Sequence, residues 1–367
     1  MARLLTIMGS GETAPAMAAV HRRLLERLGP PPLTGVVIDS PYSFQENAAE
    51  LSARAVEWFV RHTGVRMRVA SIRGPGQDRT EREEALERLR TAAYIFSGPG
   101  SPSHALRMWR DTGVPAILAH RLSTGGAISF ASAAALTLGA WTVPVYEIYK
   151  VGQEPLWLPG LDMLGPLGLT VAVIPHFDNA EGGTHDTRFC YVGERRLRVL
   201  ERSLPADHFI LGVDSHTALI LDLDAGTATV KGRGGVTIRA AGRSRVLPRD
   251  SMTTLADLPS IAADLASRPG PFLDDAQRSS LAPWPDAGPR TGKLDGPTAA
   301  SSPTAAESAA TPMTDALVEL LVEIRDRARD DRDWALSDRI RDALAEAGVE
   351  LHDRADGTDW DVRPPPA

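Results

Sequence analysis

A serine stands where an apolar strand meets a run of small residues, in the segment GGAISFASAAALTLG. Residues 127–131 predict a buried strand, Ser132 follows at once, and alanines open the next helix. A strand, a sharp turn and a helix in this order form a nucleophile elbow, which exposes the serine hydroxyl and aims a helix N-terminus at a developing oxyanion. Phe130 and Ala134 replace the glycines that usually flank such a serine. The alternative is a buried alanine-rich helix with Ser132 as its N-cap.

A histidine ends another predicted strand 44 residues later, in TVAVIPHFDNAEGGTHDTRFC. Histidine is the usual base for a serine nucleophile because its unperturbed pKa lies near neutrality. The polar loop after His176 carries Asp178, Asn179 and Arg188, which are candidates for substrate contact together with Glu147 and Lys150. A metal site is a second interpretation of the loop, but no known ligand spacing supports one. Its ligands would be His176, Asp178, His185 and Asp186.

Two glycine-rich segments also follow predicted strands. In IFSGPGSPSHAL, the small residues Gly98 and Gly100 permit a close backbone approach, and the N–H of Gly100 can point into a site. The segment GSGETA matches the dinucleotide pattern G-x-G-x-x-A, with an acidic residue about 25 positions further on. That alternative would use Gly9, Gly11, Ala14 and Asp39.

Short apolar runs alternate with amphipathic stretches over residues 1–266, which predicts a mostly parallel sheet covered by helices on both faces. The expected strands are 3–8, 36–39, 67–72, 94–97 and 127–131, and the expected helices are 16–28, 46–61 and 81–92. The runs 209–213, 217–222, 228–231 and 235–240 predict a short antiparallel finish.

Two further regions follow this α/β domain. Residues 267–312 are rich in Pro, Ala, Ser, Thr and Gly without a period, which predicts a disordered linker. Residues 313–363 regain a helical period and predict a small helical hairpin, or helical module. The module holds eight arginines and no lysine against fifteen acidic residues, so its charge of −7 equals that of the whole chain.

Composition narrows the function classes. The chain has 367 residues, 24% of them charged and 43% hydrophobic, as expected of a soluble globular protein. One cysteine excludes a disulfide framework, and no apolar run reaches the ~20 residues that cross a bilayer. The N-terminus lacks the apolar length of a signal peptide. We therefore expect a cytoplasmic protein that makes no membrane contact.

Four segments, in order, resemble the cyanophycinase and dipeptidase E family of serine peptidases. They read SGPGSPS, FASAAALTLG, PHFDN and GVDSHTALILD, and IMGSGETAP resembles the family's opening strand end. The resemblance covers residues 1–245 and implies a class I glutamine amidotransferase-like fold. It also implies that Ser132 is the nucleophile, His176 the base, and Gly100 with Ala133 the oxyanion donors. Ser129 fits the nucleophile less well because it falls inside the strand.

The sequence departs from that family at the acid. The family's glutamate after Gly-x-Asp falls on Ser215, which cannot stabilise an imidazolium as a carboxylate does. Asp214 is the nearest substitute in sequence, and Asp178 and Glu147 are alternatives. An impaired site is the remaining interpretation.

The C-terminal module resembles the end of cysteinyl-tRNA synthetase, through its Ser-Asp-Arg-Ile-Arg stretch, its Ala-Gly-Val and its Asp-Gly-Thr-Asp-Trp. In that family the segment belongs to the helical region that contacts the anticodon. Because RNA affinity rests largely on cations, the charge of −7 indicates at most weak tRNA or protein contact through residues 313–363.

These patterns predict a serine hydrolase that cleaves an amide or peptide bond in a small substrate through an acyl-enzyme on Ser132, without a metal or other cofactor. The alternative is a catalytically weak scaffold whose tail binds tRNA or a protein. The oligomeric state stays open, with a homodimer as one expectation.

Overall fold

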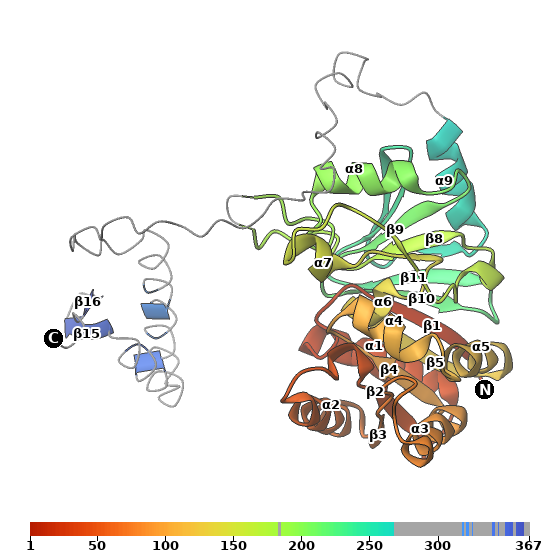
Figure 1. Cartoon of the computed structure of the whole chain (residues 1–367), viewed down its shortest axis with the longest axis horizontal. Coiled ribbons are helices and arrows are strands. Elements are labelled where there is room, and N and C mark those ends of the chain that lie inside the picture. Colours follow the sequence, from red (N-terminus) through yellow and green to blue (C-terminus); the bar gives the residue numbers. More distant parts are fainter. Residues whose placement is uncertain are drawn as a thin grey trace, which may run out of the picture. The chain divides into compact units, whose positions relative to one another are not determined.

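The computed structural model describes residues 1–182, 185–267 and, further on, residues 318, 321, 322, 325, 340, 341, 344, 349–354 and 357–362. The chain divides into two compact units, Met1–Pro283 and Trp284–Ala367 (Figure 1). Residues 268–312 of the predicted linker lie outside the described residues.

The first unit is built on an eight-stranded mixed sheet. Five strands run parallel, and three antiparallel strands extend the sheet beyond β1. In spatial order the strands are β14 (Met252–Thr254), β11 (Thr227–Gly232), β10 (Thr217–Asp222), β1 (Arg3–Met8), β5 (Gly126–Ala131), β4 (Tyr94–Ser97), β2 (Gly35–Ile38) and β3 (Met67–Ala70). Short apolar runs of this kind form parallel strands that are buried on both faces.

The unit also contains a second, six-stranded sheet, which the sequence did not predict. Its order is β13 (Arg243–Leu247), β12 (Val236–Ala240), β9 (Phe209–Val213), β8 (Val171–Ile174), β6 (Trp141–Thr142) and β7 (Leu158–Pro159). The predicted runs 209–213 and 235–240 form β9 and β12 here, whereas 217–222 and 228–231 belong to the first sheet. The chain changes sheets at residues 214–216, because β9 pairs with β8 while β10 pairs with β1.

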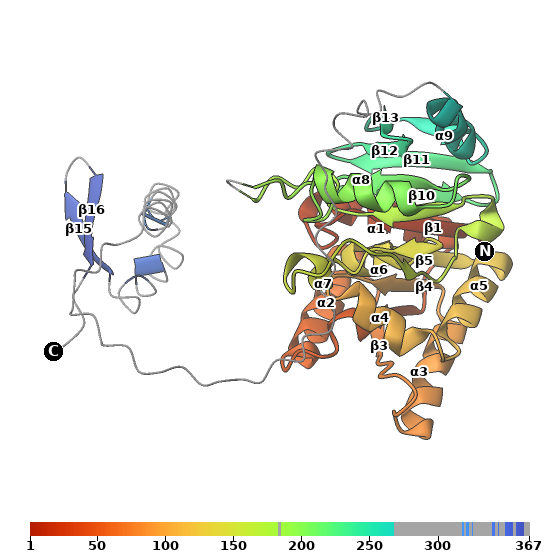
Figure 2. The same ribbon diagram turned by 45° about the horizontal axis from the view of Figure 1, so that its top comes forward.

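Helices cover both faces of the sheets, which confirms the predicted α/β class (Figure 2). They are α1 (Pro15–Leu28), α2 (Ala48–Thr63), α3 (Arg79–Thr91), α4 (Pro102–Trp109), α5 (Val114–Thr124), α6 (Ser132–Leu136), α7 (Val145–Tyr149), α8 (Glu194–Ser203) and α9 (Asp257–Ser267). Two 3₁₀ turns, Ser40–Tyr42 and Gly165–Leu167, complete the helical elements described in this unit.

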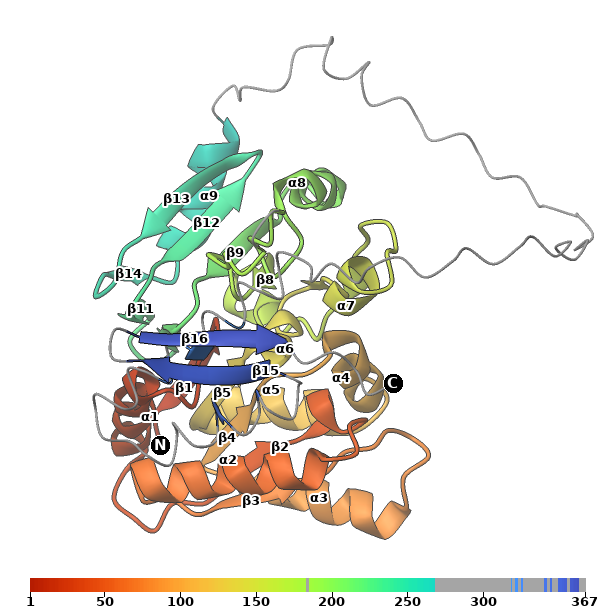
Figure 3. The ribbon, with the colours of Figure 1, turned by 90° about the vertical axis from the view of Figure 1, so that its left-hand side faces the viewer.

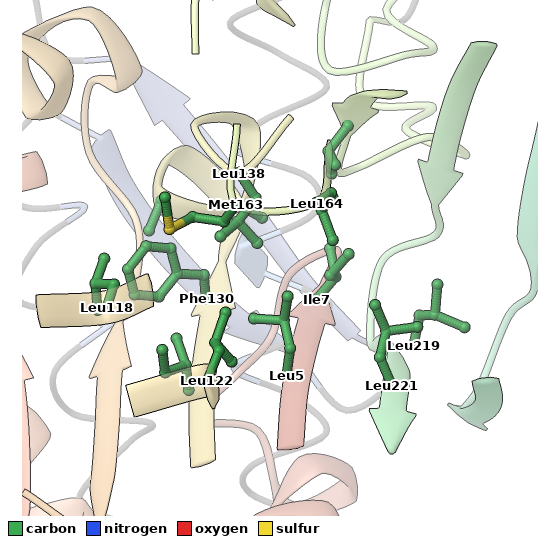
Figure 4. Close-up of a cluster of buried hydrophobic side chains, with 14 of the residues drawn as sticks. Leu5, Ile7, Leu118, Leu122, Phe130, Leu138, Met163, Leu164, Leu219 and Leu221 are labelled. Carbon is green, nitrogen blue, oxygen red and sulfur yellow. The ribbon is translucent and has the colours of Figure 1, made fainter. Parts of the chain in front are cut away.

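Alternation along β1 divides the core into two layers. Leu5 and Ile7 point into a buried cluster with Leu118 and Leu122 of α5 (Figure 4). Leu4 and Met8 point to the opposite face, where α1 and α2 contribute a second apolar cluster. Burying one such side chain stabilises the fold by about 1.5–3 kcal/mol, so both helical layers hold β1 and β5 rigidly in the middle of the sheet.

The second unit contains a β-hairpin, which the sequence did not predict. Strands β15 (Val349–Arg354) and β16 (Gly357–Val362) pair antiparallel, with Leu351 opposite Trp360 (Figure 3). Residues 318, 321, 322, 325, 340, 341 and 344 are helical, as expected. The prediction of a purely helical module is therefore wrong for residues 349–354 and 357–362. Apolar and polar residues alternate there with a period of two, as in Val349, Glu350, Leu351 and His352.

Within the described part of the chain, no helix has both the length and the apolar character that a membrane crossing requires.

Candidate functional site

The carboxyl ends of three adjacent parallel strands meet at one edge of the first sheet. Met8 of β1 lies opposite Ala131 of β5, and Ser97 of β4 lies opposite Phe130. The residues that follow these strands are therefore neighbours in space. This edge is where ligands bind in open α/β sheets.

Ser132 begins α6 directly after β5 with a φ of 49°. A serine in this left-handed region carries backbone strain, which persists only where the surroundings impose it. Strain of this kind is typical of functional sites. Ser129, in contrast, is fully buried inside β5 and cannot meet a substrate.

Ser132 and His176 lie in direct contact, with 2.9 Å between Oγ and Nε2. His176 comes two residues after β8 of the second sheet, so the pair joins the two sheets. Burial lowers the pKa of His176, while Glu181 and Asp178 raise it and His216 lowers it further. Because burial dominates, the imidazole is neutral near pH 7 and can accept the hydroxyl proton.

A left-handed turn supports the backbone of His176. Phe189, Cys190 and Tyr191 have φ values of 61°, 56° and 65°, which is unusual for three consecutive residues other than glycine. The Cys190 N–H donates to the His176 carbonyl at 3.1 Å, and the Phe189 N–H donates to the Phe177 carbonyl at 3.1 Å. Burial raises the pKa of the Cys190 thiol to about 12.

The predicted acid, Asp214, is held elsewhere. Its Oδ2 accepts a hydrogen bond from the Gly235 N–H at 2.7 Å, and burial raises its pKa. Asp178 Oδ1 accepts from the Ser215 N–H at 2.7 Å. Among the residues of the described ranges, no carboxylate hydrogen-bonds to His176. The turn at residues 214–216 directs Asp214 toward the loop before β12, which the sequence could not indicate.

Of the two predicted oxyanion donors, Ala133 directly follows Ser132, and Gly100 belongs to the glycine turn after β4. Gly100 has a φ of 135°, and a Cβ there would lie 2.1 Å from the Pro41 carbonyl oxygen, so only glycine fits. The Ala134 N–H donates to the Gly98 carbonyl at 3.2 Å, which ties the glycine turn to α6. The N–H groups of Gly100 and Ala133 donate to no acceptor in residues 1–182 and 185–267.

Two of the predicted substrate residues keep an unused polar atom. Glu147 accepts at Oε1 from the Ser103 hydroxyl, while its buried Oε2 has no partner in the described chain. Asn179 accepts at Oδ1 from the Glu181 N–H at 3.0 Å, while its buried Nδ2 makes no hydrogen bond within 3.5 Å in the described chain, although the Asn179 side chain acts to lower the pKa of the nearby Tyr191 hydroxyl. Buried polar atoms are normally satisfied, so these two are available to a ligand.

The two predicted substrate cations are occupied. Lys150 Nζ lies 5.0 Å from the centre of the Tyr149 ring, and two guanidinium nitrogens of Arg188 donate to the Asp186 carboxylate at 2.8 and 2.9 Å. The Arg188 guanidinium also holds the pKa of Asp186 well below its usual range. Within the described chain, neither cation forms a hydrogen bond with Ser132 or His176.

Contacts within the chain account for the dinucleotide-like residues. A Cβ on Gly9 would lie 2.0 Å from the Asp214 carbonyl oxygen, and one on Gly11 would lie 2.1 Å from His216 Nδ1. Asp39 is nearly buried and accepts from two guanidinium nitrogens of Arg73 at 2.8 and 2.9 Å. Gly9 and Gly11 allow the backbone to pack closely against residues 214–216, and Asp39 forms an ion pair with Arg73.

The loop does not gather the ligands of the metal alternative. Asp186 pairs with Arg188, and His185 Nε2 lies 3.3 Å from the Tyr149 hydroxyl. Over the described residues, no group of three or more His, Cys, Asp or Glu side chains is arranged to hold a metal ion.

Sequence reasoning assigned no role to Glu12, Glu181, Tyr191 or His216. Glu12 is only 9% exposed although it follows a strand end at the same edge as Ser132. The Tyr191 hydroxyl donates to Glu181, one of the carboxylates that act on His176. The position of Glu12 after β1 was a usable signal, because residues at that edge share one site. The pairing of Tyr191 with Glu181 had no signal in the sequence.

Comparison with solved structures and comparison with curated sequences give matches to different proteins. The chain is similar to the crystal structure of a peptidase from an acI-B1 actinobacterium, with 21% identity and a TM-score of 0.55 over 69% of this chain and 97% of that one. A putative peptidase E protein from Listeria monocytogenes EGD-e matches with 13% identity and a TM-score of 0.43, over 64% of this chain and 100% of that one. The first likeness establishes the fold. No family model matches the chain.

The sequence matches are short. The chain is 52% identical over 61 residues to a cysteine–tRNA ligase of Micrococcus luteus and 50% identical over 44 residues to one of Fusobacterium nucleatum. These segments make up 16% and 12% of this chain, and the chain spans only 13% and 9% of the two ligases. The predicted resemblance to this synthetase is thus confirmed for a short segment.

Proposed function

We propose that the first unit is a serine hydrolase that cleaves an amide or peptide bond through an acyl-enzyme on Ser132. The observation that carries the proposal is the 2.9 Å contact between Ser132 Oγ and His176 Nε2 at the carboxyl edge of the sheet. A nucleophile within hydrogen-bond distance of a base is the geometry that nucleophilic catalysis requires. The left-handed φ of Ser132 supports a nucleophile elbow.

The residues have the following roles in the proposed reaction. Ser132 Oγ attacks the substrate carbonyl carbon while His176 Nε2 takes the hydroxyl proton. The negative oxygen of the tetrahedral intermediate accepts from the N–H groups of Gly100 and Ala133. His176 then returns the proton to the leaving amine, and a water molecule hydrolyses the ester on Ser132 by the same steps.

In the proposed reaction, two carboxylates that form no hydrogen bond with His176 take the electrostatic role of the triad acid. Asp178 and Glu181 both raise the pKa of His176, so they favour the imidazolium that forms during the reaction. The hydroxyl of Tyr191 and the N–H of Ser215 hold these two carboxylates in place. We therefore assign the acid's electrostatic role to Asp178 and Glu181 rather than to Asp214.

A small peptide or amide substrate would find its polar partners nearby. Glu147 Oε2 can accept from a substrate N–H or ammonium, and Asn179 Nδ2 can donate to a substrate carbonyl. Leaving either atom unpaired in the free enzyme costs ~1–3 kcal/mol, which substrate binding would recover.

A fluorophosphonate probe tests this function directly. We expect the folded protein to displace fluoride from the probe and form a phosphonyl ester on Ser132, located by peptide mass mapping. Heat-denatured protein is the matched control and should not react, since reaction needs His176 beside the hydroxyl. Labelling of another serine, or no labelling of the folded protein, would contradict the proposal.

A second function is proposed for the tail, because the short ligase match concerns proteins that act on tRNA. We propose weak tRNA contact through residues 313–363, limited by the charge of −7. Titration of the full chain with cysteine-specific and bulk tRNA at ~150 mM salt should show weak binding that falls steeply with salt. Tight binding selective for the cysteine tRNA would favour the scaffold alternative as the leading function.

A further inference from the structure

The carboxyl of Glu12 lies beside the turn that carries a proposed oxyanion donor. Its Oε1 is 3.5 Å from the position that a Cβ on Gly98 would occupy. The Gly98 carbonyl accepts from the Ala134 N–H, two residues beyond Ser132. Glu12 therefore borders the glycine turn that follows β4, and this hydrogen bond ties the same turn to α6.

This carboxyl is buried without a partner from another residue. Glu12 is 9% exposed, and within residues 1–182 and 185–267 no other residue gives its side chain a hydrogen bond or an ion pair. Burial raises the pKa of Glu12 above its ordinary value and outweighs the opposing effect of its own backbone N–H. A buried carboxyl without a further donor costs free energy unless something supplies one. The small exposed fraction means that a group from solvent can reach it.

The buried side chain of His21 holds the backbone of Glu12 in place. His21 Nε2 lies 2.9 Å from the Glu12 carbonyl oxygen, and His21 Nδ1 lies 2.6 Å from the Tyr94 hydroxyl. Burial lowers the pKa of His21 to about 4, so this imidazole is neutral. Its Nε2–H donates a hydrogen bond to the Glu12 carbonyl, and its Nδ1 accepts one from the Tyr94 hydroxyl. The rings of Trp58, Phe59 and Phe96 surround it. A rigid support of this kind is what a binding residue needs.

We propose that Glu12 binds a protonated amine on the acyl side of the scissile bond and thereby selects the substrates of Ser132. This inference rests on the proposed hydrolase function. An ammonium group supplies both the positive charge and the N–H donors that the carboxylate lacks. The acyl side follows from Gly100, since the turn that Glu12 borders would hold the oxygen of the attacked carbonyl.

Three diphenyl phosphonates distinguish the source of the amine. The first carries alanine with a free α-amine, and the second carries Nα-acetylalanine. The third carries Nα-acetyllysine, whose side-chain amine is free. In each case Ser132 Oγ attacks phosphorus, His176 takes the proton, and a phenoxide leaves. We measure the second-order rate of labelling of Ser132 by mass spectrometry, for the wild type, Glu12→Gln and Glu26→Gln. Glu26 is an exposed glutamate near the other end of α1 and serves as the matched control.

We expect the wild type to react at least ~10-fold faster with a free-amine or lysyl probe than with N-acetylalanine, which is the discrimination that ~1.4 kcal/mol gives. In Glu12→Gln that ratio should fall to about one, and in Glu26→Gln it should stay. A preference for the free α-amine identifies an N-terminal substrate residue, and a preference for N-acetyllysine identifies a cationic side chain.

Equal rates for all three probes on wild-type Ser132 would overturn the role of Glu12 and leave the hydrolase function intact. That role is also overturned if Glu12→Gln, folded by circular dichroism, keeps the wild-type ratio. Glu12→Asp, which keeps the charge but shortens the side chain, replaces Glu12→Gln if the latter does not fold, and the ratio should then fall as well. If no probe labels Ser132, both the hydrolase function and the inference fall.

Discussion

Replacing Ser132 with alanine should abolish amide hydrolysis, with a loss in kcat on the order of 10⁶-fold. Loss of a serine nucleophile removes covalent catalysis altogether, because no other hydroxyl takes its place beside the base. The fold should persist, since the substitution deletes one hydroxyl next to Ala131 and Ala133, which are buried and well packed. Turnover of a peptide mixture by mass spectrometry measures the loss, and thermal unfolding measures the fold.

Ser123→Ala is the matched control for that experiment. Ser123 is exposed on α5, and its hydroxyl donates to the His120 carbonyl within the same helix. Its removal should leave turnover unchanged and should change the free energy of unfolding by no more than ~0.5 kcal/mol. If Ser132→Ala retained turnover, Ser132 would not be the nucleophile.

Replacing His176 with asparagine should reduce kcat/KM by on the order of 10³-fold or more, as loss of a triad base does. Asparagine is the informative choice because His176 has a φ of 47°, and asparagine tolerates this left-handed backbone better than most residues. The variant should therefore keep the loop while losing the proton acceptor beside Ser132. An unchanged rate would show that His176 is not the base and has only a structural place after β8.

The pH profile provides a second measurement on the same residue. Catalysis needs neutral His176, so kcat/KM should rise with pH through the pKa of this group. Since burial lowers that pKa, the midpoint should lie below the ordinary value of 6.5. Asp178→Asn removes a charge that raises the pKa and should move the midpoint to still lower pH. A midpoint above 6.5 in the wild type would contradict a base governed by burial.

Much of the first unit was predictable because its strands are continuous apolar runs that end at polar or glycine residues. The predicted ranges 3–8 and 94–97 coincide with β1 and β4. The division into two sheets was not predictable, since β9 and β10 are separated by only three residues and look like one hairpin in sequence. Which neighbours each strand pairs with depends on tertiary packing, which local patterns do not encode.

The candidate site was predictable where position on an element decides it. Ser132 and His176 follow strands, and the structure brings them together. The choice among carboxylates was not predictable, because Asp214, Asp178 and Glu181 are all close in sequence to the base or to the acid position. Only the hydrogen bonds from Gly235, Ser215 and Tyr191 distinguish them.

The turn that holds His176 also provides a built-in reporter. Cys190 is the chain's single cysteine, it is buried, and its N–H donates to the His176 carbonyl. Alkylating reagents attack the thiolate and need access, so they reach this sulfur only when the turn opens. The rate of alkylation therefore measures how often the turn that holds His176 opens. Binding of a substrate that stabilises the closed loop would slow that rate, which allows affinity to be measured without any turnover.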